Sequence, residues 1–388
     1  MNDTAPAQQR MEQLAHEFPV NEEWLWANHA AISPWPRSTR EAVSAFALEN
    51  QNQGAVDYGR WLRHEADLRQ RLARLIGAAS DRDVALLPNT TEGINLVARG
   101  LSWHSGDNIV TTSSEFPSNH LAWAALKRHG VELRPVDIRL ADNAEQALIQ
   151  AMDQRTRLLA VSSVQWTDGF RLELGQLGEV CRRRQVLFFV DAIQELGALP
   201  LAVERDHIDV LVAGSHKWQM GAEGLALCCI GEALRQTIQP LKLGWRMFRD
   251  PFEFDPTKQS EETSARRYES GTPNTLGQIA LNASLGLYEQ WGTDWVATRI
   301  RANTNQLIET LGTVAGLRVA SATEPERRSG IVAIGSDRYD SSALEQALRK
   351  HRIMSVARGG LLRLSPHYYQ GEQDMSRLCD ALIEVHTR

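Results

Sequence analysis

The 388-residue chain has few of the features that mark secreted or membrane proteins. It contains only four cysteines, Cys181, Cys228, Cys229 and Cys379, and no C-x-x-C pair, so we expect no disulfide framework. Cys228 and Cys229 lie in the apolar run "LALCCI" and are predicted to be buried and unreactive. No run of 18 apolar residues is present, which argues against a transmembrane helix.

Charge and terminal signals are also weak. The formal net charge of −6 mixes both signs, so it does not predict a nucleic-acid surface. The N-terminal stretch "MNDTAPAQQRMEQLAHEF" is polar and lacks the apolar core of a signal peptide. The eleven tryptophans follow no repeat spacing, which gives no support to a solenoid or propeller. We therefore expect a cytoplasmic protein with no nucleic-acid or membrane partner.

What the chain does have is a regular alternation between about residues 60 and 240. Apolar runs typical of strands occur at 83–88, 106–117, 131–138, 156–166, 186–194 and 208–215. Segments typical of helices lie between them, at 61–78, 89–103, 118–130 and 174–185. This alternation predicts an α/β fold, with a mostly parallel sheet covered by helices on both faces.

The pattern changes after about residue 250. A long polar segment, "RDPFEFDPTKQSEETSARRYESGTPNTLG", is followed by helical segments at 278–292 and 294–312. Short strands at 317–321, 330–336, 353–358 and 361–366 follow, which predicts a smaller α+β domain. We expect an N-terminal segment, 1–20, that packs with the small domain, a large domain over 21–260, and a small C-terminal domain over 261–388.

Polar side chains collect where the predicted strands end. They lie at 89–95, 115–119, 165–168, 191–194 and 215–217. Because ligands of open α/β sheets bind outside the carboxyl ends of the strands, these five clusters predict one shared site.

Lys217, in "AGSHKWQ", has the setting of a nucleophilic lysine. An amine attacks a carbonyl only when neutral, and apolar or cationic surroundings lower its pKa. Asp191 ends the apolar strand "VLFFVD", where a buried carboxylate needs a cationic partner such as a protonated pyridine nitrogen. Gln194 lies three residues on and could reach the same ligand.

A phosphate site is indicated by "NTTEGIN", where a helix begins. Backbone N–H groups at a helix N-terminus bind phosphate, and the hydroxyls of Thr90 and Thr91 add donors. Each feature alone has an ordinary explanation: a strand-end lysine, an aspartate cap, a capping box. Their order and shared location together predict a pyridoxal 5'-phosphate site.

These motifs resemble the class V aminotransferase family of fold type I pyridoxal-phosphate enzymes, which includes cysteine desulfurases, isopenicillin N epimerase-like proteins and kynureninases. The resemblance rests on "NTTEGINLVARGL", "VDAIQELGALPL", "AGSHKW" and "RYESGTPN" and covers nearly the whole chain. It implies a large pyridoxal-phosphate-binding domain with a seven-stranded-type sheet, a smaller C-terminal α+β domain, and an α-amino acid substrate.

The resemblance also implies roles for individual residues. Lys217 would carry the internal aldimine, and Asp191 would pair with the pyridine nitrogen. Thr272 would reach the phosphate held by a second subunit, which implies a homodimer with shared sites. The cofactor contacts implied in full are Thr90, Thr91, Phe116, Asp191, Gln194, Ser215, His216, Lys217 and Thr272. The substrate contacts implied are His29, Ala30, Arg358 and Arg363, with Arg363 clamping the α-carboxylate.

The chain departs from the desulfurase pattern in three places. Phe116 stands where desulfurases carry a histidine over the cofactor, and Trp166 stands at an asparagine position. The segment "SVARGGLLRLSP" contains no nucleophilic cysteine. A persulfide-forming desulfurase is therefore not expected. Trp26, Trp35, Trp166 and Trp218 are predicted near the site, either as an aromatic wall or as packing.

Three functions stay open from the sequence. One base, Lys217, suffices for transamination, and an aminotransferase is our main prediction. The alternatives in the same family are a C–S lyase acting by β-elimination without a catalytic cysteine, as in desulfurase- or ergothioneine-pathway-like enzymes, and an amino acid epimerase. Epimerisation would need a second base, for which His29 and His120 are candidates. A non-catalytic pyridoxal-phosphate-binding scaffold is the alternative outside enzymes.

Overall fold

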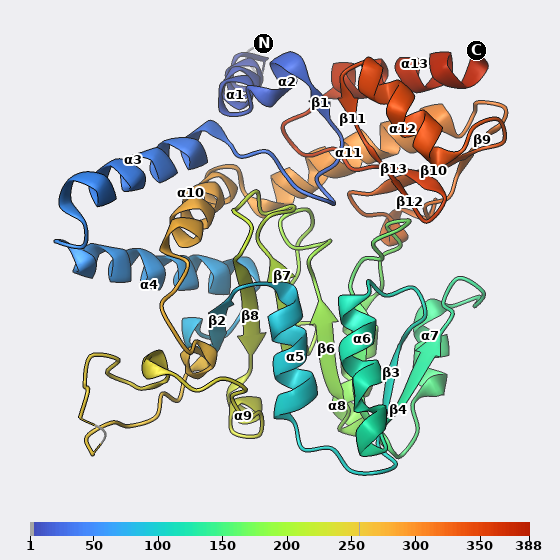
Figure 1. Cartoon of the computed structure of the whole chain (residues 1–388). Helices are drawn as coiled ribbons and strands as arrows, with labels where there is room; N and C mark the ends of the chain where they lie inside the picture. Colours follow the sequence, from blue (N-terminus) through green and yellow to red (C-terminus); the bar gives the residue numbers. More distant parts are fainter. Residues whose placement is uncertain (1–3, 256) are drawn as a thin grey trace.

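The computed structural model describes residues 4–255 and 257–388, with side chains from residue 10 onward. The predicted segment 1–20 therefore includes residues 1–3 that lie outside the described chain, as does residue 256 in the polar segment. Figure 1 shows a large sheet with helices around it in one half of the molecule and a smaller sheet with its helices in the other.

The large sheet has seven strands in the order β2-β8-β7-β6-β5-β3-β4. The strands, in chain order, are β2 (Val84–Leu87), β3 (Asn108–Thr112), β4 (Glu132–Val136), β5 (Thr156–Ser162), β6 (Leu187–Asp191), β7 (Val210–Gly214) and β8 (Ala226–Ile230). Strands β4, β3, β5, β6 and β7 run parallel, and β8 is antiparallel to both of its neighbours. The predicted mostly parallel, seven-stranded sheet is confirmed.

Helices cover both faces because the central strands are apolar on both sides. Phe188 and Phe189 are adjacent in β6, and they belong to two different buried clusters. The helices of this half are α3 (Arg37–Gln53), α4 (Tyr58–Leu75), α5 (Thr90–Gly100), α6 (Ser118–Ala124), α7 (Ala144–Ala151), α8 (Leu174–Arg184) and α9 (Glu232–Arg235). Helix α5 packs beside α6 on the face that Phe189 serves, and α4, α7 and α8 pack on the other.

The smaller sheet is antiparallel, with the order β12-β13-β10-β9. Its strands are β9 (Leu317–Val319), β10 (Val332–Ser336), β12 (Val356–Arg358) and β13 (Leu361–Leu364), and α10 (Thr275–Trp291), α11 (Thr293–Leu311), α12 (Ser341–Lys350) and α13 (Glu372–Thr387) complete this half of the chain. The predicted small α+β domain is confirmed. The boundary between 260 and 261 stays a prediction, and α10 packs against α3 and α4 of the other half.

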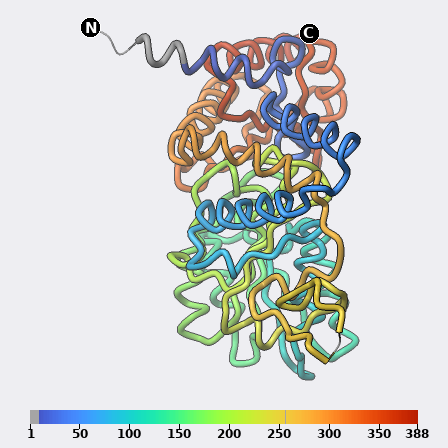
Figure 2. Tube along the Cα trace, turned by 90° about the vertical axis from the view of Figure 1, so that its left-hand side faces the viewer, coloured from blue at the N-terminus to red at the C-terminus, as the bar shows by residue number. Residues whose placement is uncertain are grey.

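The N-terminal segment contains α1 (Thr4–Glu17), α2 (Val20–Glu23) and β1 (Leu25–Trp26). Strand β1 pairs in parallel with β11 (Ile353–Met354), and the ring of Phe18 stacks on that of Tyr369 at 3.9 Å. Helices α1 and α13 lie at the same end of the molecule (Figures 1 and 2). The one strand predicted over 353–358 is two, because 353–354 pair with β1 and 356–358 pair with β13.

Short 3-10 turns complete the fold at Asp81–Asp83, Ala125–His129, Trp245–Met247, Ala265–Tyr268 and Pro325–Arg327. In the described residues, no helix is long and apolar enough to cross a membrane. The same residues contain no group of three or more His, Cys, Asp or Glu side chains that could hold a metal ion.

Candidate active site

A cavity of about 370 Å³ opens at the carboxyl ends of the central strands. Strands β5, β6 and β7 end beside it, the N-terminus of α5 borders it, and β12 and β13 reach it from the small sheet. Its lining is Ala30, Ala31, Ile32, Asn89, Thr90, Thr91, Phe116, Ser118, Ser162, Trp166, Asp191, Ile193, Gln194, His216, Lys217, Arg358 and Arg363. Each of the five predicted strand-end clusters contributes at least one residue to this lining, and the clusters at 89–95 and 191–194 contribute three each.

Lys217 follows β7 in a short turn and is half-buried. Burial lowers the pKa of its amine to about 8. The Asp191 carboxylate opposes this effect, and the guanidinium groups of Arg363 and Arg358 add to it. A larger fraction of this amine is therefore neutral near neutral pH than for an ordinary lysine.

Asp191 ends β6 and is only 3% exposed. Burial raises the pKa of its carboxyl to about 7, and Lys217 lowers it only in part. Its carboxylate accepts one hydrogen bond from the backbone N–H of Ile193, at 3.0 Å. A buried carboxylate with so little compensation favours a cationic ligand atom beside it.

Glu115 is a functional candidate that the sequence did not single out. It is buried beyond Ser162, the residue paired with Asp191 in the sheet, and its carboxylate accepts hydrogen bonds from Ser162 N at 2.8 Å and Ser162 Oγ at 2.5 Å. The side chains of Thr112 and Asn119 donate two more. Burial raises the pKa of Glu115, and the four hydrogen bonds that it accepts oppose this effect by favouring the ionised carboxylate. The charge of Glu115 in turn raises the pKa of Asp191.

The opposite wall is the N-terminus of α5. The Asn89 side chain caps the helix by accepting a hydrogen bond from the N–H of Glu92 at 2.9 Å. In the described part of the chain, the buried Oγ1 of Thr90 has no hydrogen-bond partner. Thr91 Oγ1 donates to Ser118 Oγ at 2.9 Å. An unpartnered hydroxyl at a helix N-terminus fits an anionic group in the cavity.

Two aromatic side chains form an apolar wall. The rings of Phe116 and Trp166 meet edge to face with centroids 5.5 Å apart, and Lys217 Nζ lies 5.8 Å from the Phe116 centroid. The indole N–H of Trp166 donates to the backbone carbonyl of Ser114 at 3.0 Å, so it is not offered to a ligand. Phe116 is 44% exposed, which leaves a ring face open to the cavity.

Two arginines line the cavity from the small sheet. Arg363, on β13, is 2% exposed, and its Nη1 donates to the carbonyl of Trp166 at 2.7 Å. Its buried Nε has no partner among the described residues. Burial and the neighbouring Arg358 lower the pKa of Arg363 to about 10. Two positive groups so close together favour an anionic ligand.

Of the remaining predicted site residues, some line the cavity and others do not. Ala30 and His216 line the cavity, and burial lowers the pKa of His216. Gln194 also lines it, but its Nε2 donates to Ala30 O at 3.0 Å and its Oε1 accepts from Trp218 Nε1 at 3.1 Å. The hydroxyl of Ser215 donates to backbone carbonyls instead, and Ser215 is not part of the lining.

Besides Ser215, three further predicted side chains are absent from the lining: those of His29, His120 and Thr272. His29 is fully buried, with Nδ1 2.8 Å from Ser365 O and Nε2 2.9 Å from the Tyr369 hydroxyl. Thr272 lines a separate cavity of about 300 Å³. Of the four tryptophans predicted near the site, only Trp166 is in the lining.

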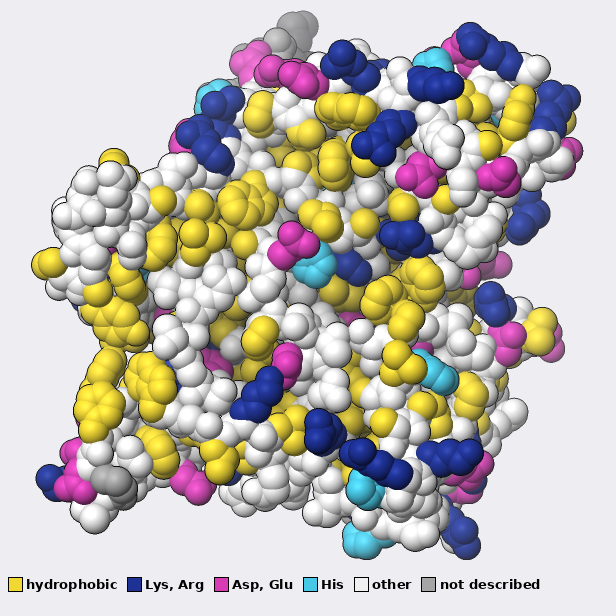
Figure 3. Space-filling model, viewed as in Figure 1, with side chains coloured by type: hydrophobic (Ala, Val, Ile, Leu, Met, Phe, Trp, Pro, Cys, Tyr) yellow, Lys and Arg dark blue, Asp and Glu magenta, His cyan; other side chains and the backbone are white. Residues whose placement is uncertain are grey.

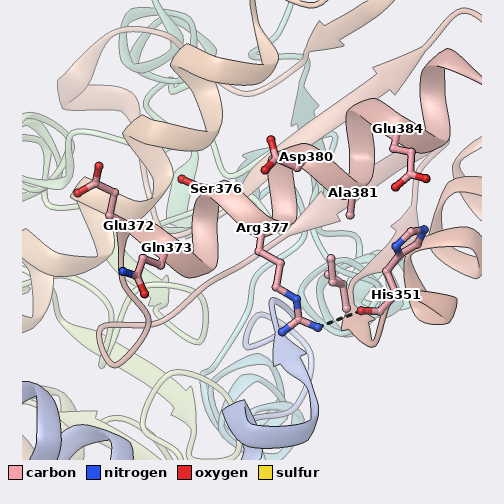
Figure 4. A pocket seen from close by; sticks show the side chains of 9 residues that line it. His351, Glu372, Gln373, Ser376, Arg377, Asp380, Ala381 and Glu384 are labelled. Atoms are coloured by element: carbon pink, nitrogen blue, oxygen red, sulfur yellow. Dashed lines mark hydrogen bonds between the residues drawn. The ribbon is translucent and has the colours of Figure 1, made fainter.

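A larger hollow, of about 680 Å³, lies along α13 and is shown in Figure 4. Glu372, Arg377, Asp380 and Glu384 line it from the helix, and Arg377 donates a hydrogen bond to the carbonyl of His351 at 3.1 Å. It shares no residue with the cavity at Lys217. Because the predicted lysine, aspartate and arginines line the cavity at Lys217, we place the candidate active site there.

A family profile described as aminotransferase class V matches residues 29–366. A probable cysteine desulfurase of Methanothermobacter thermautotrophicus is 26% identical, with 97% of this chain and 98% of that protein covered. Isopenicillin N epimerase of Streptomyces clavuligerus is 28% identical, with 92% and 93% covered.

Among solved structures, the cystine C–S lyase C-DES in complex with its product cysteine persulfide is similar, with a TM-score of 0.88 and 26% identity over 95% of this chain and 99% of that chain. An apo cysteine desulfurase from Thermococcus onnurineus has a TM-score of 0.88 at 23% identity, over 97% and 98% of the two chains. At that identity the likeness shows the fold alone.

Proposed function

The chain belongs to the class V aminotransferase family of pyridoxal-phosphate-dependent enzymes, and from this premise we propose that it transfers the amino group of an α-amino acid, with Lys217 as the catalytic base. The observation that carries the proposal is the placement of Lys217, Asp191 and Arg363 around one cavity. A non-catalytic scaffold would not need these three side chains in one cavity.

The residues present fit pyridoxal phosphate. The unpartnered hydroxyl of Thr90 at the start of α5 suits the phosphate, and the under-compensated carboxylate of Asp191 suits the pyridine nitrogen. Lys217 Nζ would hold the cofactor, and the open face of Phe116 would lie against its ring. When bound, the cofactor supplies an electron sink that makes the α-hydrogen of an amino acid acidic.

The chain's own residues supply binding, orientation and proton transfer. Arg363 is proposed to bind the α-carboxylate through its guanidinium, for which the unpartnered Nε is available. Lys217 Nζ is proposed to remove the α-proton of the amino acid and to deliver it to a different carbon, as transamination requires. The wall of Phe116 and Trp166 is apolar and offers no proton of its own to the cavity.

A racemising reaction is disfavoured by the same geometry. A second base would have to face the α-carbon from the side opposite Lys217. Neither His29 nor His120 lines the cavity, and both ring nitrogens of His29 are engaged in hydrogen bonds. We therefore propose transamination or β-elimination, each of which needs one base, in preference to epimerisation.

The second candidate function is β-elimination from a sulfur-containing amino acid. It is favoured by the similarity to a cystine C–S lyase over almost the whole of both chains. All four cysteines are buried and none lines the described cavity, so a persulfide-forming cysteine is not part of either proposal. A thiolate or persulfide leaves without help from a second acid, which makes Lys217 sufficient.

Association of two chains is part of the proposal. Thr272 lies in another cavity than Lys217, which is consistent with a contact to a second subunit's phosphate. Apolar side chains are exposed at Leu48 and Val56 near the end of α3, and hydrophobic side chains gather over α3 and α4 on the face in Figure 3. A homodimer that covers this face, located in the cytoplasm, remains our prediction.

The test is a visible absorbance spectrum of the purified protein with and without a panel of amino acids. We expect a band from lysine-bound cofactor, its absence in Lys217→Ala, and its loss in the parent protein when an amino acid donates its amino group. Persistence of the band while pyruvate and a thiol accumulate would establish the lyase instead. Full activity in Lys217→Ala would contradict both functions.

A further inference from the structure

The turn that carries Lys217 is held from outside through its backbone carbonyls. The carbonyl of His216 accepts from Ser33 N at 2.9 Å, and that of Lys217 accepts from Ser33 Oγ at 2.6 Å. The carbonyl of Gln219 accepts from Ser284 Oγ at 2.5 Å. These partners come from segments far apart in the chain, so the base of the Lys217 side chain is fixed by tertiary contacts.

The carbonyl of Trp218 accepts two hydrogen bonds, from the hydroxyl of Tyr288 and from Nε2 of His367 at 3.0 Å. The Nδ1 of His367 accepts from the backbone N–H of Tyr368 at 2.9 Å. A backbone N–H can only donate, so Nδ1 is unprotonated and Nε2 carries the proton. Burial lowers the pKa of His367 to about 3, which keeps the ring a neutral donor near neutral pH.

His367 follows Arg363 by four residues on a rigid stretch. Strand β13 ends between them, and the backbone of His367 is fixed twice: its N–H donates to Gln370 Oε1 at 2.8 Å and its carbonyl accepts from Asn303 Nδ2 at 2.9 Å. One short segment therefore joins the guanidinium in the cavity to the carbonyl of Trp218.

We propose that His367 is a positioning residue that transmits binding of the substrate carboxylate at Arg363 to the turn bearing Lys217. The inference rests on the proposed function, because it takes Arg363 as the carboxylate anchor and Lys217 as the base. Tyr288 donates to the same carbonyl from α10, which is not continuous with β13. Its hydroxyl also lies 3.3 Å from Nε2 of His367, so Tyr288 belongs to the same cluster as His367. Ser284, also on α10, holds the neighbouring carbonyl of Gln219 and is the separate support of the turn.

The first experiment compares three variants of the full-length holoenzyme. His367→Met removes the donor at similar size, His367→Gln keeps an N–H donor, and Ser284→Ala removes the donor to the neighbouring carbonyl of Gln219. We expect His367→Met to lower kcat by about 10- to 100-fold with little change in KM, because the lysine is misplaced while the anchor remains. His367→Gln should restore most of kcat.

The second experiment combines these variants with Arg363→Lys. We expect the combined loss of kcat/KM in the double variant His367→Met with Arg363→Lys to be smaller than the product of the two single losses, because both substitutions interrupt the same connection. The combined loss of kcat/KM in Ser284→Ala with Arg363→Lys should equal the product of its two single losses. Equal kcat in His367→Met and the parent protein, no rescue by Gln, or independent losses with Arg363→Lys would overturn the proposal.

A third readout needs no turnover. In cofactor-free protein, the rate at which trinitrobenzenesulfonate labels Lys217 reports the exposure of its amine, and acetate occupies the carboxylate anchor. We expect acetate to change the labelling rate in Ser284→Ala as it does in the parent protein, and we expect this change to be lost in His367→Met. A change that persists in His367→Met overturns the coupling. Failure of the proposed function would instead appear as an unchanged KM in Arg363→Lys.

Discussion

Lys217 experiences opposing influences whose balance sets its reactivity. Burial and two arginines lower the pKa of its amine, and Asp191 raises it. The net effect is a pKa of about 8 for the amine, below that of an ordinary lysine. Glu115 adds a second buried carboxylate behind Asp191, which increases the affinity of this side of the cavity for a positive group.

The first prediction at this scale concerns pH. The rate at which cofactor-free protein gains visible absorbance after addition of pyridoxal phosphate should rise with pH through a midpoint near 8, because only the neutral amine reacts. Arg358→Gln should move the midpoint to higher pH, because Arg358 lowers the pKa of Lys217. Asp191→Asn should move it to lower pH, because that carboxylate raises the same pKa. A midpoint near the ordinary lysine value of about 10.4 would contradict the argument.

The second prediction concerns the carboxylate anchor. Arg363→Lys should raise KM for the amino acid by about 30-fold, equivalent to about 2 kcal/mol, because a lysine cannot form the paired contact of a guanidinium. The measurement is steady-state kinetics on the amino acid found active in the spectral screen. Arg358→Lys is the matched control, since Arg358 is exposed at the rim and its change should cost less.

At the scale of elements, α5 places the phosphate side of the cavity by lying close to β7. A Cβ on Gly93 would come 2.5 Å from Cγ1 of Val212, a buried strand residue. Helix α5 therefore approaches the sheet as closely as it does because residue 93 is glycine. The position of Thr90 at the cavity depends on that approach.

Gly93→Ala should accordingly destabilise the protein by about 1–3 kcal/mol, because the gain in helix propensity is smaller than the cost of the clash. It should also weaken retention of the cofactor. Gly286→Ala is the matched control, since its Cβ in α10 would meet nothing closer than 3.6 Å. That variant should gain about 0.5–1 kcal/mol. The measurement is thermal unfolding of both variants. Equal losses of stability in the two would contradict the packing argument.

At the scale of the whole molecule, the separation of Thr272 from Lys217 predicts complementation between subunits. Thr272→Glu, at an exposed position, should repel a phosphate held by a second chain. Coexpression of Thr272→Glu with Lys217→Ala should restore about one quarter of the sites, because half of the dimers are mixed and one of their two sites is intact. The measurement is specific activity of the mixed preparation. A fully active monomer would contradict shared sites.

Much of the fold followed from local pattern. The apolar runs that became β2 to β7 and the cap at Asn89 are local properties, so the sequence predicted them correctly. Helix α7, between β4 and β5, was not among the predicted elements, and the single strand expected over 353–358 was divided by its two partners. Pairing partners are distant in the chain, and local periodicity does not encode them.

The sequence by itself determined the family, the sheet and the chemical types at the strand ends, because a lysine, an acid and a capped helix start each bear a local mark. Only the tertiary structure decided which of these groups share a cavity. It left Ser215 and His29 out of the lining and brought in Ile32 and Ser162. It also buried Glu115 behind Asp191 and set His367 against the turn of Lys217. Burial and contact between distant segments arise only when the chain is packed.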